Sequence, residues 1–330
     1  MNYRRLGRTG LKVSTICLGT MQFGWTTDEP TAHTVLNRAI ELGINFIDTA
    51  DVYSRWHPGN PGGVSETHIG NWLAGGVPRD QIVLATKVRG KMGDGPNDQG
   101  LSRGHIMSAV EASLRRLRTD YIDLYQTHSP DDETPLDETL RALEDLVRSG
   151  KVRYVGCSNY PAWLLAKALW ISDVRNIVRY DSLQPHYSYV HRAEFERELQ
   201  PLCLDQGVGV IPYSPLAAGF LTGKYRRGQP LPESARADNV QRRYMNEQGF
   251  AAVDKLEEIG RQTGLQSGHE ATIAQTAIAW VLANPAVTSA IIGANSVAQL
   301  EDTIKGADVA LSAEDKAALD EVTAWSQAGR

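Results

Sequence analysis

The sequence of 330 residues has little cysteine and no disulfide pattern. Its three cysteines, Cys17, Cys157 and Cys203, are far apart and odd in number. They form neither the paired framework of a small secreted protein nor a CxxC metal knuckle. A reducing compartment is therefore expected, and we predict a cytoplasmic protein.

Long apolar runs and a surplus of basic charge are also missing. No apolar stretch approaches the ~20 residues of a transmembrane helix. The N-terminal segment carries three arginines but lacks the apolar core of a signal peptide. The 34 Lys and Arg residues are spread among 39 Asp and Glu residues, which gives a net charge of −5. We therefore expect neither a membrane nor a nucleic acid as partner.

Several nucleotide and metal motifs are absent or incomplete. No GxGxxG follows the first predicted strand, so the usual dinucleotide fingerprint is missing. Residues 218–225 resemble a phosphate-binding loop, but Ala218 replaces its first glycine and Tyr225 its magnesium-binding Ser or Thr. His57 and His68 do not form the HExxH pair of a zinc site. We expect neither ATP hydrolysis nor a metal centre.

What the sequence does contain is a regular alternation of β-rich runs and helical patterns after a short hairpin, Tyr3–Leu6 with Leu11–Ser14. The predicted strands are Thr15–Gly19, Asn45–Thr49, Ile82–Val88, Tyr121–Gln126, Val152–Cys157, Ser182–His186, Val208–Tyr213 and Thr288–Ile292. The predicted helices are Ala32–Leu42, Glu66–Leu73, His105–Leu117, Leu136–Arg148, Pro161–Ile171, Phe195–Leu204, further helices after residue 248, and Val297–Ile304. Eight strand–helix units predict an α/β fold, a (β/α)8 TIM barrel with an N-terminal β-hairpin, as one domain over residues 1–330. An open doubly wound sheet is the alternative.

Two connections are longer than the usual ~4–6 residues. They are Arg89–Arg103 and Gly219–Gln248, and each follows a predicted strand. In a barrel both lie on the face that carries the active site, where long loops line or cover the site. An ordinary surface insertion is the alternative.

Polar residues with reactive side chains stand at three consecutive strand ends. Asp48 and Lys87 end the second and third strands, His128 follows the fourth, and Tyr53 lies five residues after Asp48. Each alone has an ordinary structural explanation, but the C-terminal ends of barrel strands meet at one face. The four residues are therefore expected to converge on one site.

The chemistry that these four side chains suggest is proton transfer. A tyrosine with a pKa of ~10 is a poor acid near neutral pH unless a cation stabilises its phenolate. Lys87 could provide that cation, with Asp48 holding Lys87 charged and in place. A tyrosine hydroxyl and a histidine directed at one carbonyl oxygen form an electrophilic cradle for an oxyanion.

A second set of polar residues stands on the later strands. Ser158 and Asn159 end the fifth strand, Gln184 lies on the sixth, and Tyr213 ends the seventh. Such amides and hydroxyls suit a carboxamide, and a tyrosine face suits a flat ring. Residues 293–296 open the last helix, where free backbone N–H groups can hold phosphate. The alternative is that these are cap and turn residues.

Together these motifs resemble the aldo-keto reductase superfamily over essentially the whole chain. The motifs that carry the resemblance are the opening segment Tyr3–Ser14, Phe46–Tyr53, Ala85–Lys87, Tyr121–His128, Val155–Asn159, Tyr213–Leu216, Leu221–Tyr225 and Ile291–Ser296. The sequence is similar to bacterial members that lack a long C-terminal specificity loop, and a helix Ala313–Trp325 is expected instead. It also resembles potassium channel β-subunits, but without their long N-terminal extension, so we expect no channel role.

The resemblance implies an enzyme that reduces aldehydes and ketones with NADP(H). It implies that Tyr53 is the proton donor, that Asp48 and Lys87 lower its pKa, and that His128 binds and polarises the carbonyl group. The cofactor-binding residues that we assign are Thr20, Met21, Asp48, Ser158, Asn159, Gln184, Tyr213, Ser214, Pro215, Leu216, Lys224, Arg236, Gly293, Asn295 and Gln299. Trp25, Trp56 and His128 are assigned to the substrate. An apolar wall that includes Trp25 and Trp56 would favour aromatic or medium-sized carbonyl compounds, and ordinary packing of these side chains is the alternative.

The sequence departs from the pattern of this superfamily near the expected adenosine 2′-phosphate. No Lys or Arg lies between Gly293 and Gln299, and Thr303 replaces an asparagine. A charged pair with phosphate contributes more than a neutral hydrogen bond, so NADH use is not excluded. Two other functions are kept as alternatives: a cofactor-binding redox sensor or regulatory subunit, and a barrel enzyme of unrelated chemistry such as a lyase.

Overall fold

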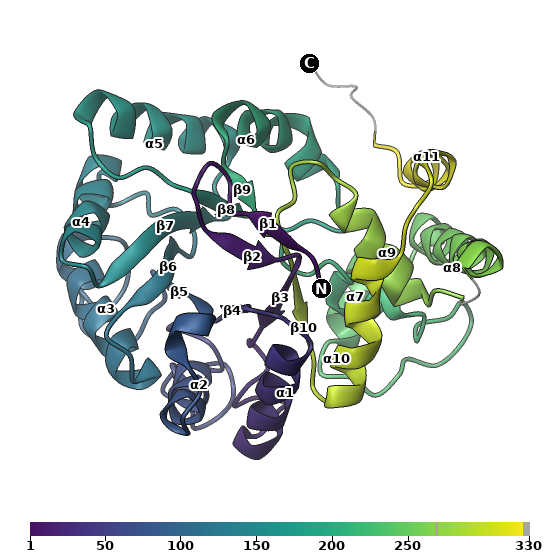
Figure 1. Ribbon diagram of the computed structural model, residues 1–330, viewed down its shortest axis with the longest axis horizontal. Coiled ribbons are helices and arrows are strands. Elements are labelled where there is room, and N and C mark those ends of the chain that lie inside the picture. The colour runs from purple at the N-terminus through teal and green to yellow at the C-terminus, as the bar shows by residue number, and fades with distance from the viewer. Residues whose placement is uncertain (268–269, 326–330) are drawn as a thin grey trace.

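The computed structural model, which describes residues 1–267 and 270–325, is a (β/α)8 barrel (Figure 1). Its parallel strands, in the order β10-β3-β4-β5-β6-β7-β8-β9, are Ala290–Gly293, Ile16–Gly19, Phe46–Asp48, Val83–Val88, Ile122–Thr127, Val152–Ser158, Ser182–Gln184 and Gly209–Val210. Hydrogen bonds across the last gap close the ring: Thr288 N–H donates to Val210 O at 2.7 Å and Ile291 N–H to Pro212 O at 3.0 Å. These bonds exclude the open-sheet alternative, which would leave two free edges.

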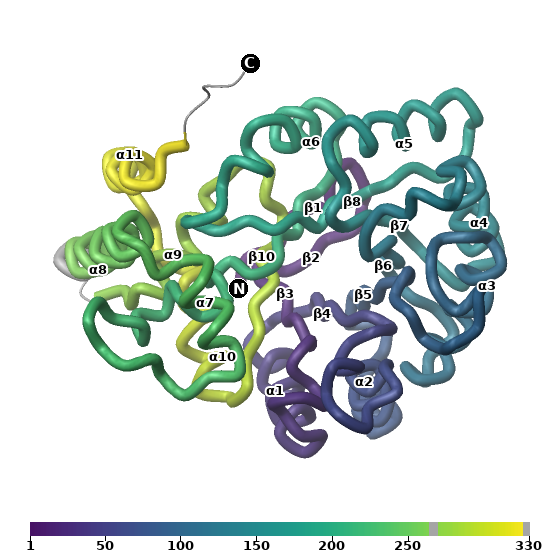
Figure 2. Tube along the Cα trace, turned by 180° about the vertical axis from the view of Figure 1, so that it is seen from behind, coloured from purple at the N-terminus to yellow at the C-terminus, as the bar shows by residue number. Residues whose placement is uncertain are grey.

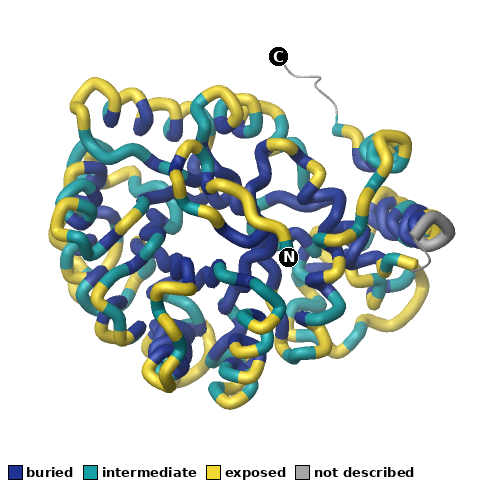
Figure 3. Tube along the Cα trace, viewed as in Figure 1, coloured by how far each residue is buried: buried dark blue, intermediate teal, exposed yellow. Residues whose placement is uncertain are grey.

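Helices surround the barrel on its outer side (Figure 1). They are α1 Glu29–Glu41, α2 Val64–Ala74, α3 Arg103–Leu117, α4 Leu136–Arg148, α5 Ala162–Arg175, α6 Gln200–Gln206, α7 Ala237–Tyr244, α8 Glu247–Ser267, α9 Ile273–Leu282, α10 Val297–Ile304 and α11 Ala313–Val322. A π-helical segment, η2 Phe195–Leu199, leads into α6, and the 3₁₀ segments are η1 Arg79–Gln81, η3 Ala217–Thr222 and η4 Lys305–Asp308. The barrel strands are mostly buried, whereas the outer helix faces are exposed (Figure 3). None of the described helices is long and apolar enough to span a membrane.

Side-chain caps explain where several helices begin. Asp28 accepts a hydrogen bond from the N–H of Thr31 at the start of α1, and Ser102 caps α3 in the same way. Thr272 and Gln275 form a reciprocal capping box at the start of α9. Such caps satisfy N–H groups that have no partner inside the helix.

The N-terminal hairpin closes one end of the barrel. Its strands β1 Tyr3–Arg5 and β2 Lys12–Ser14 are antiparallel and cross the barrel in Figure 1. Leu6 and Val13 are buried and belong to an apolar cluster with residues from inside the barrel. Figure 2 looks from the opposite side, onto the end where the strands finish. The hairpin therefore leaves only that second end open to a ligand.

The predicted strands and helices are confirmed in order, although several of their ends differ by a few residues, and other differences are larger. The predicted strands Ser182–His186 and Val208–Tyr213 are shorter as β8 and β9, because Pro185 and Pro212 have no N–H to continue the sheet. The predicted loop Gly219–Gln248 contains η3 and α7. The final helix ends at Val322 rather than Trp325, since Thr323 leaves helical geometry.

Candidate active site

Lys87 joins three parts of the predicted site through direct hydrogen bonds. Its ammonium group donates to Asp48 Oδ2 at 2.6 Å, to the backbone oxygen of Thr49 at 2.8 Å and to the Tyr53 hydroxyl at 2.9 Å. Lys87 is fully buried, and all three of its donors are used. Asp48, Lys87 and Tyr53 therefore form one connected unit at the open end of the barrel.

Two glutamine amides hold the other oxygen of Asp48. Gln184 donates to Asp48 Oδ1 at 2.9 Å and Gln126 donates at 3.1 Å. Gln126 was not among the predicted residues, although it pairs with Lys87 across β5 and β6. Gln126 stands two residues before His128, and this same-side spacing on a strand is the sequence signal that could have identified it. The buried carboxylate is thus fully supplied with donors.

Burial and charge set the protonation of Lys87 and Tyr53. Burial alone lowers the pKa of Lys87, but Asp48 and Tyr53 outweigh it, so the pKa is raised and the ammonium form is kept. Burial raises the pKa of Tyr53, and Lys87 opposes this only in part. The expected lowering by Lys87 is present, but the net shift is upward, and Asp48 adds to it. Tyr53 therefore retains its proton until a stronger base is adjacent.

His128 lies directly after β6 and faces Tyr53. The two rings meet edge to face with centroids 5.8 Å apart. Burial, and then the charges of Lys87 and Arg89, lower the pKa of His128 from 6.5 to about 3. The imidazole is therefore neutral near pH 7, and its remaining N–H can act as a hydrogen-bond donor without adding a second positive charge.

The two predicted substrate tryptophans lie beside Tyr53. Trp25 and Trp56 meet edge to face with centroids 5.7 Å apart, and the Trp56 ring is 6.2 Å from that of Tyr53. Trp56 is 46% exposed. The guanidinium group of Arg236 lies 5.6 Å from the centre of the Trp25 ring. These rings form an apolar wall next to the tyrosine hydroxyl.

The residues predicted for a carboxamide and a flat ring are also adjacent. Tyr213 donates to Asn159 Oδ1 at 3.0 Å, and Ser158 donates to the Gln184 backbone oxygen at 2.9 Å. One face of the Tyr213 ring stacks on His186, with centroids 5.2 Å apart and planes 12° from parallel. No described ring stacks on its other face, and the residue is partly exposed.

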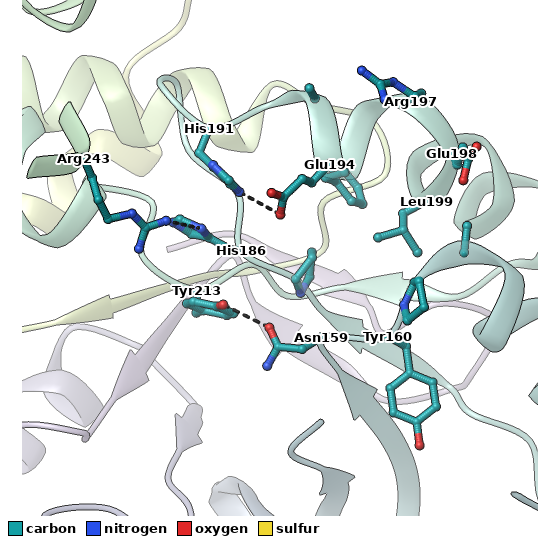
Figure 4. Close-up of a pocket in the computed structure, with 15 residues that line it drawn as sticks. Asn159, Tyr160, His186, His191, Glu194, Arg197, Glu198, Leu199, Tyr213 and Arg243 are labelled. Carbon is teal, nitrogen blue, oxygen red and sulfur yellow. Dashed lines mark hydrogen bonds and ion pairs between the residues drawn. The ribbon is translucent and has the colours of Figure 1, made fainter. Parts of the chain in front are cut away.

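A cavity of about 580 Å³ opens next to Tyr213 and Asn159 (Figure 4). His186 and His191 stack above Tyr213, and His191 bonds to Glu194 at 3.1 Å. The lining carries both arginines and glutamates, and it includes none of the four proposed proton-transfer residues. The cavity therefore lies next to the site formed by Asp48, Lys87 and Tyr53. It is not the cleft in which a ligand would meet Tyr53.

The loop after β9 combines unusual backbone with unpaired positive charge. Ser214, Ala217 and Ala218 have φ of 55°, 49° and 57°, a left-handed conformation that costs free energy in residues other than glycine. Lys224 and Arg236 form no salt bridge within residues 1–267 and 270–325, and burial and then the charge of Arg236 lower the pKa of Lys224. Two cations without a salt-bridge partner in the described residues suit an anion such as a phosphate.

The predicted adenosine end, at the start of α10, is polar but uncharged. Ser296 caps the helix, and Asn295 Oδ1 accepts hydrogen bonds from Thr26 and Thr27. The amide oxygen of Gln299 accepts from the N–H of Asn295 at 2.9 Å. Gly293 ends β10 at this position. The donors here are neutral, as the sequence indicated.

The remaining predicted cofactor residues differ in what their side chains can offer. Thr20 is buried, and its hydroxyl already bonds to Asp48 O at 3.0 Å and to Ser65 at 2.8 Å. Met21, two residues after β3, is partly exposed, while Pro215 and Leu216 lie between the left-handed residues Ser214 and Ala217. Thr20 thus supports the strand end, and its hydroxyl has no donor left for a ligand. In the described ranges no group of three or more His, Cys, Asp and Glu side chains is placed to hold a metal ion.

Comparison with known proteins places this site in context. The family model "Aldo/keto reductase family" matches residues 15–324. The chain is 43% identical to the uncharacterized oxidoreductase YrpG of Bacillus subtilis, over 95% of this chain and 93% of that protein. It is 36% identical to a probable voltage-gated potassium channel subunit beta of Arabidopsis thaliana, over 94% and 92%. It is 35% identical to versiconal hemiacetal acetate reductase of Aspergillus parasiticus, over 97% and 96%.

Proposed function

The chain belongs to the aldo/keto reductase family of oxidoreductases, and we propose that it reduces aldehydes and ketones to alcohols with NADP(H), with Tyr53 as the proton donor. The observation that carries this proposal is the 2.9 Å hydrogen bond from the Lys87 ammonium to the Tyr53 hydroxyl. Asp48 holds that ammonium from the other side at 2.6 Å. The cytoplasmic location and the single-domain organisation stay predictions from the sequence.

Proton transfer follows from the charges around Tyr53. When bound, the nicotinamide cofactor supplies a hydride to the carbonyl carbon. Tyr53 gives its proton to the carbonyl oxygen, and the phenolate that remains is stabilised by Lys87, which Asp48 keeps charged. His128 is neutral and donates an N–H to the same oxygen, which polarises the carbonyl bond. The raised pKa of Tyr53 keeps the acid protonated until negative charge develops on that oxygen.

The residues present fit a nicotinamide dinucleotide. The open face of Tyr213 suits the nicotinamide ring, with Ser158, Asn159 and Gln184 around its carboxamide. Met21 and the backbone of residues 214–216 would line the same groove. The unpaired cations Lys224 and Arg236 suit the phosphates, and the start of α10 with Gly293, Asn295 and Gln299 suits the adenosine end. Preference for NADPH over NADH rests on Arg236, since the start of α10 carries no cation.

The substrate that this site suits carries an apolar group next to its carbonyl. Trp25 and Trp56 form a wall beside Tyr53, and His128 is the polar group across from it. Aromatic rings pack favourably edge to face against such a wall. Aromatic and medium-sized aldehydes are therefore the proposed substrate class.

A second candidate function is favoured by one observation: relatives of comparable identity are named potassium channel subunits. The protein would then bind the cofactor and regulate a partner, with little turnover. Tight NADPH binding combined with negligible reduction of a broad set of carbonyl compounds would support this candidate.

The test is NADPH oxidation with 4-nitrobenzaldehyde by wild type and Tyr53→Phe. We expect the substitution to lower kcat about 10³-fold, as loss of a general acid does, with NADPH affinity kept. Tyr3→Phe is the matched control, because that hydroxyl bonds to Gly43 O on the hairpin side of the barrel. Near-normal turnover of Tyr53→Phe would show that another group delivers the proton.

A further inference from the structure

Asp51 carries a buried carboxyl group that has no partner. It stands between Asp48 and Tyr53 in the turn after β4. The residue is fully buried, and neither carboxyl oxygen forms a hydrogen bond or ion pair within the part of the chain that the structure describes. An ionised carboxylate in such a place is strongly disfavoured, whereas a protonated carboxyl costs far less.

The cations near Asp51 are already neutralised. Lys87 on β5 pairs with Asp48, and Arg116 on α3 pairs with Glu66 on α2 at 2.7 Å. Two positive and two negative charges therefore balance in this region without Asp51. A negative charge on Asp51 would leave an uncompensated buried anion, which is why the balance requires its neutral form.

The hydroxyl of Tyr125 on β6 is a second unpartnered group on the same side. It is fully buried, and its pKa is raised by burial and then by Asp51 and Glu66. Burial, followed by the charge of Glu66, likewise raises the pKa of Asp51 well above its usual range, against the weaker opposing effects of Arg116, the neighbouring backbone N–H of Val52 and Lys87. The ionisable groups that face Asp51 are thus Glu66, Lys87, Arg116 and Tyr125, and none of them donates to it.

The backbone of Asp51 connects the turn of Tyr53 to the strand of Lys87. The Asp51 N–H donates to the backbone oxygen of Lys87 at 3.2 Å, and the Tyr53 N–H donates to Ala50 O at 3.3 Å. Residues 50–53 therefore form a tight turn held against β5. The burial of the Asp51 side chain fixes where this turn sits, and hence where the Tyr53 hydroxyl meets the Lys87 ammonium.

We propose that Asp51 is a positioning residue that stays protonated during turnover. As a neutral acid it fills the space behind the 50–53 turn and leaves the charge of Lys87 to Tyr53. As an anion it would compete with Tyr53 for the positive charge of Lys87. It would thereby disfavour the phenolate that remains after Tyr53 gives up its proton. This role rests on the proposed function for its kinetic consequence, but the neutral state of Asp51 stands independently of it.

The neutral state is tested by the free energy of unfolding of Asp51→Asn, in urea, from pH 5 to pH 9. Asparagine matches the protonated acid in size and cannot ionise. In wild type the unfolded chain releases the Asp51 proton above a pH of ~4, while the folded chain keeps it. Wild type therefore loses stability relative to Asp51→Asn as pH rises.

Asp123→Asn is the matched control for the stability measurement. Asp123 accepts hydrogen bonds from Arg79 at 2.7 Å and from the N–H of Leu84 at 2.9 Å. Here the same substitution removes a charge that is used, so it should destabilise the protein at pH 7. If Asp51→Asn is as destabilising as Asp123→Asn, Asp51 is ionised and the proposal is wrong.

The positioning role is tested by the pH profile of kcat/KM for the aldehyde. Asp51→Ala, which removes the packed group, should lower kcat about tenfold or more, and Asp51→Asn should restore most of it. The alkaline decline of activity should occur at the same pH in wild type and in Asp51→Asn, because a carboxyl group that stays protonated adds no charge beside Lys87 in either protein. Alkaline declines at clearly different pH values in the two proteins, or an inactive but folded Asp51→Asn, would overturn the role. A wild type without turnover would reject the proposed function, and the stability series would still decide the state of Asp51.

Discussion

The interior of the barrel contains two layers of side chains, a lower layer near the hairpin and an upper layer near the open end. The lower layer is apolar and the upper layer is polar. On three neighbouring strands the residue nearer the hairpin is apolar and the residue two positions later is polar: Phe46 and Asp48 on β4, Ala85 and Lys87 on β5, and Leu124 and Gln126 on β6. Residues two apart point to the same side of a strand, so both layers face the interior. The lower layer packs with the hairpin in one apolar cluster, whereas the upper layer is a hydrogen-bonded network. The lower layer therefore contributes to stability, and the upper layer directly above it provides the polar groups of the site.

The upper layer can be buried despite its charges because each charged group has hydrogen-bond partners. Lys87 has three acceptors and Asp48 has three side-chain donors. The apolar layer below excludes water, which strengthens the electrostatic interactions above it. Removing one charged member should thus have a larger effect than removing an apolar residue of similar size.

Lys87→Met should give the largest effect in this comparison, because it changes stability and catalysis together. It leaves Asp48 as an unpaired buried carboxylate, which should cost about 3–5 kcal/mol of unfolding free energy. It also removes the cation that stabilises the phenolate, so kcat should fall about 10²–10³-fold. Urea unfolding and NADPH oxidation measure the two effects on the same preparation.

The double variant Asp48→Asn with Lys87→Met separates these effects. It removes the unpaired carboxylate, so most of the lost stability should return while activity stays low. Equal stability of the single and double variants would mean that the Lys87–Asp48 pair contributes little, and that the two layers differ less than their contacts indicate.

Leu124→Ala, in the lower layer, should affect stability alone. Leu124 is fully buried in the apolar cluster beneath Gln126. The cavity it leaves should cost about 2–5 kcal/mol, while kcat stays within about twofold of wild type at a temperature where the variant is folded. A large fall in kcat for the folded variant would show that the upper layer depends on the packing beneath it.

Part of the upper layer can be predicted from the sequence, because its polar residues follow the apolar runs of the predicted strands. Asp48, Lys87 and His128 were recognisable because a polar residue ended an apolar run on three consecutive strands. Gln126 was missed because its hydrogen bond to Asp48 depends on strand register, which the sequence does not specify. The order of the barrel strands was predicted in full, whereas α7 was missed because its residues Ala237–Tyr244 are mostly polar and lie within a predicted loop.

The upward shift in the pKa of Tyr53 could not be predicted from residue types. A lysine next to a tyrosine predicts a lowered pKa, and Lys87 does act in that direction. The depth of burial decides the net sign, and burial is a property of the assembled barrel. For the same reason the unpartnered carboxyl of Asp51 is invisible in the sequence, where it looks like another charged residue of a turn.

We expect the smallest effect for Arg236, a positive charge outside the barrel interior. Inside the barrel each charge has a partner, but Arg236 in the loop after β9 has no salt bridge among the described residues and lies over Trp25. If it holds a cofactor phosphate, Arg236→Ala should raise KM for NADPH about tenfold, because a charge-assisted bond contributes roughly 1.5–3 kcal/mol. The free energy of unfolding should not fall, since no folded-state ion pair is lost. Arg242→Ala on α7, where the side chain donates to Asn239 Oδ1 at 3.2 Å, is the matched control. An equal rise in KM for NADPH and NADH would place Arg236 at the pyrophosphate. A rise in KM confined to NADPH would place it at the 2′-phosphate. Arg236 would then be the source of cofactor preference, because the start of α10 carries no cation.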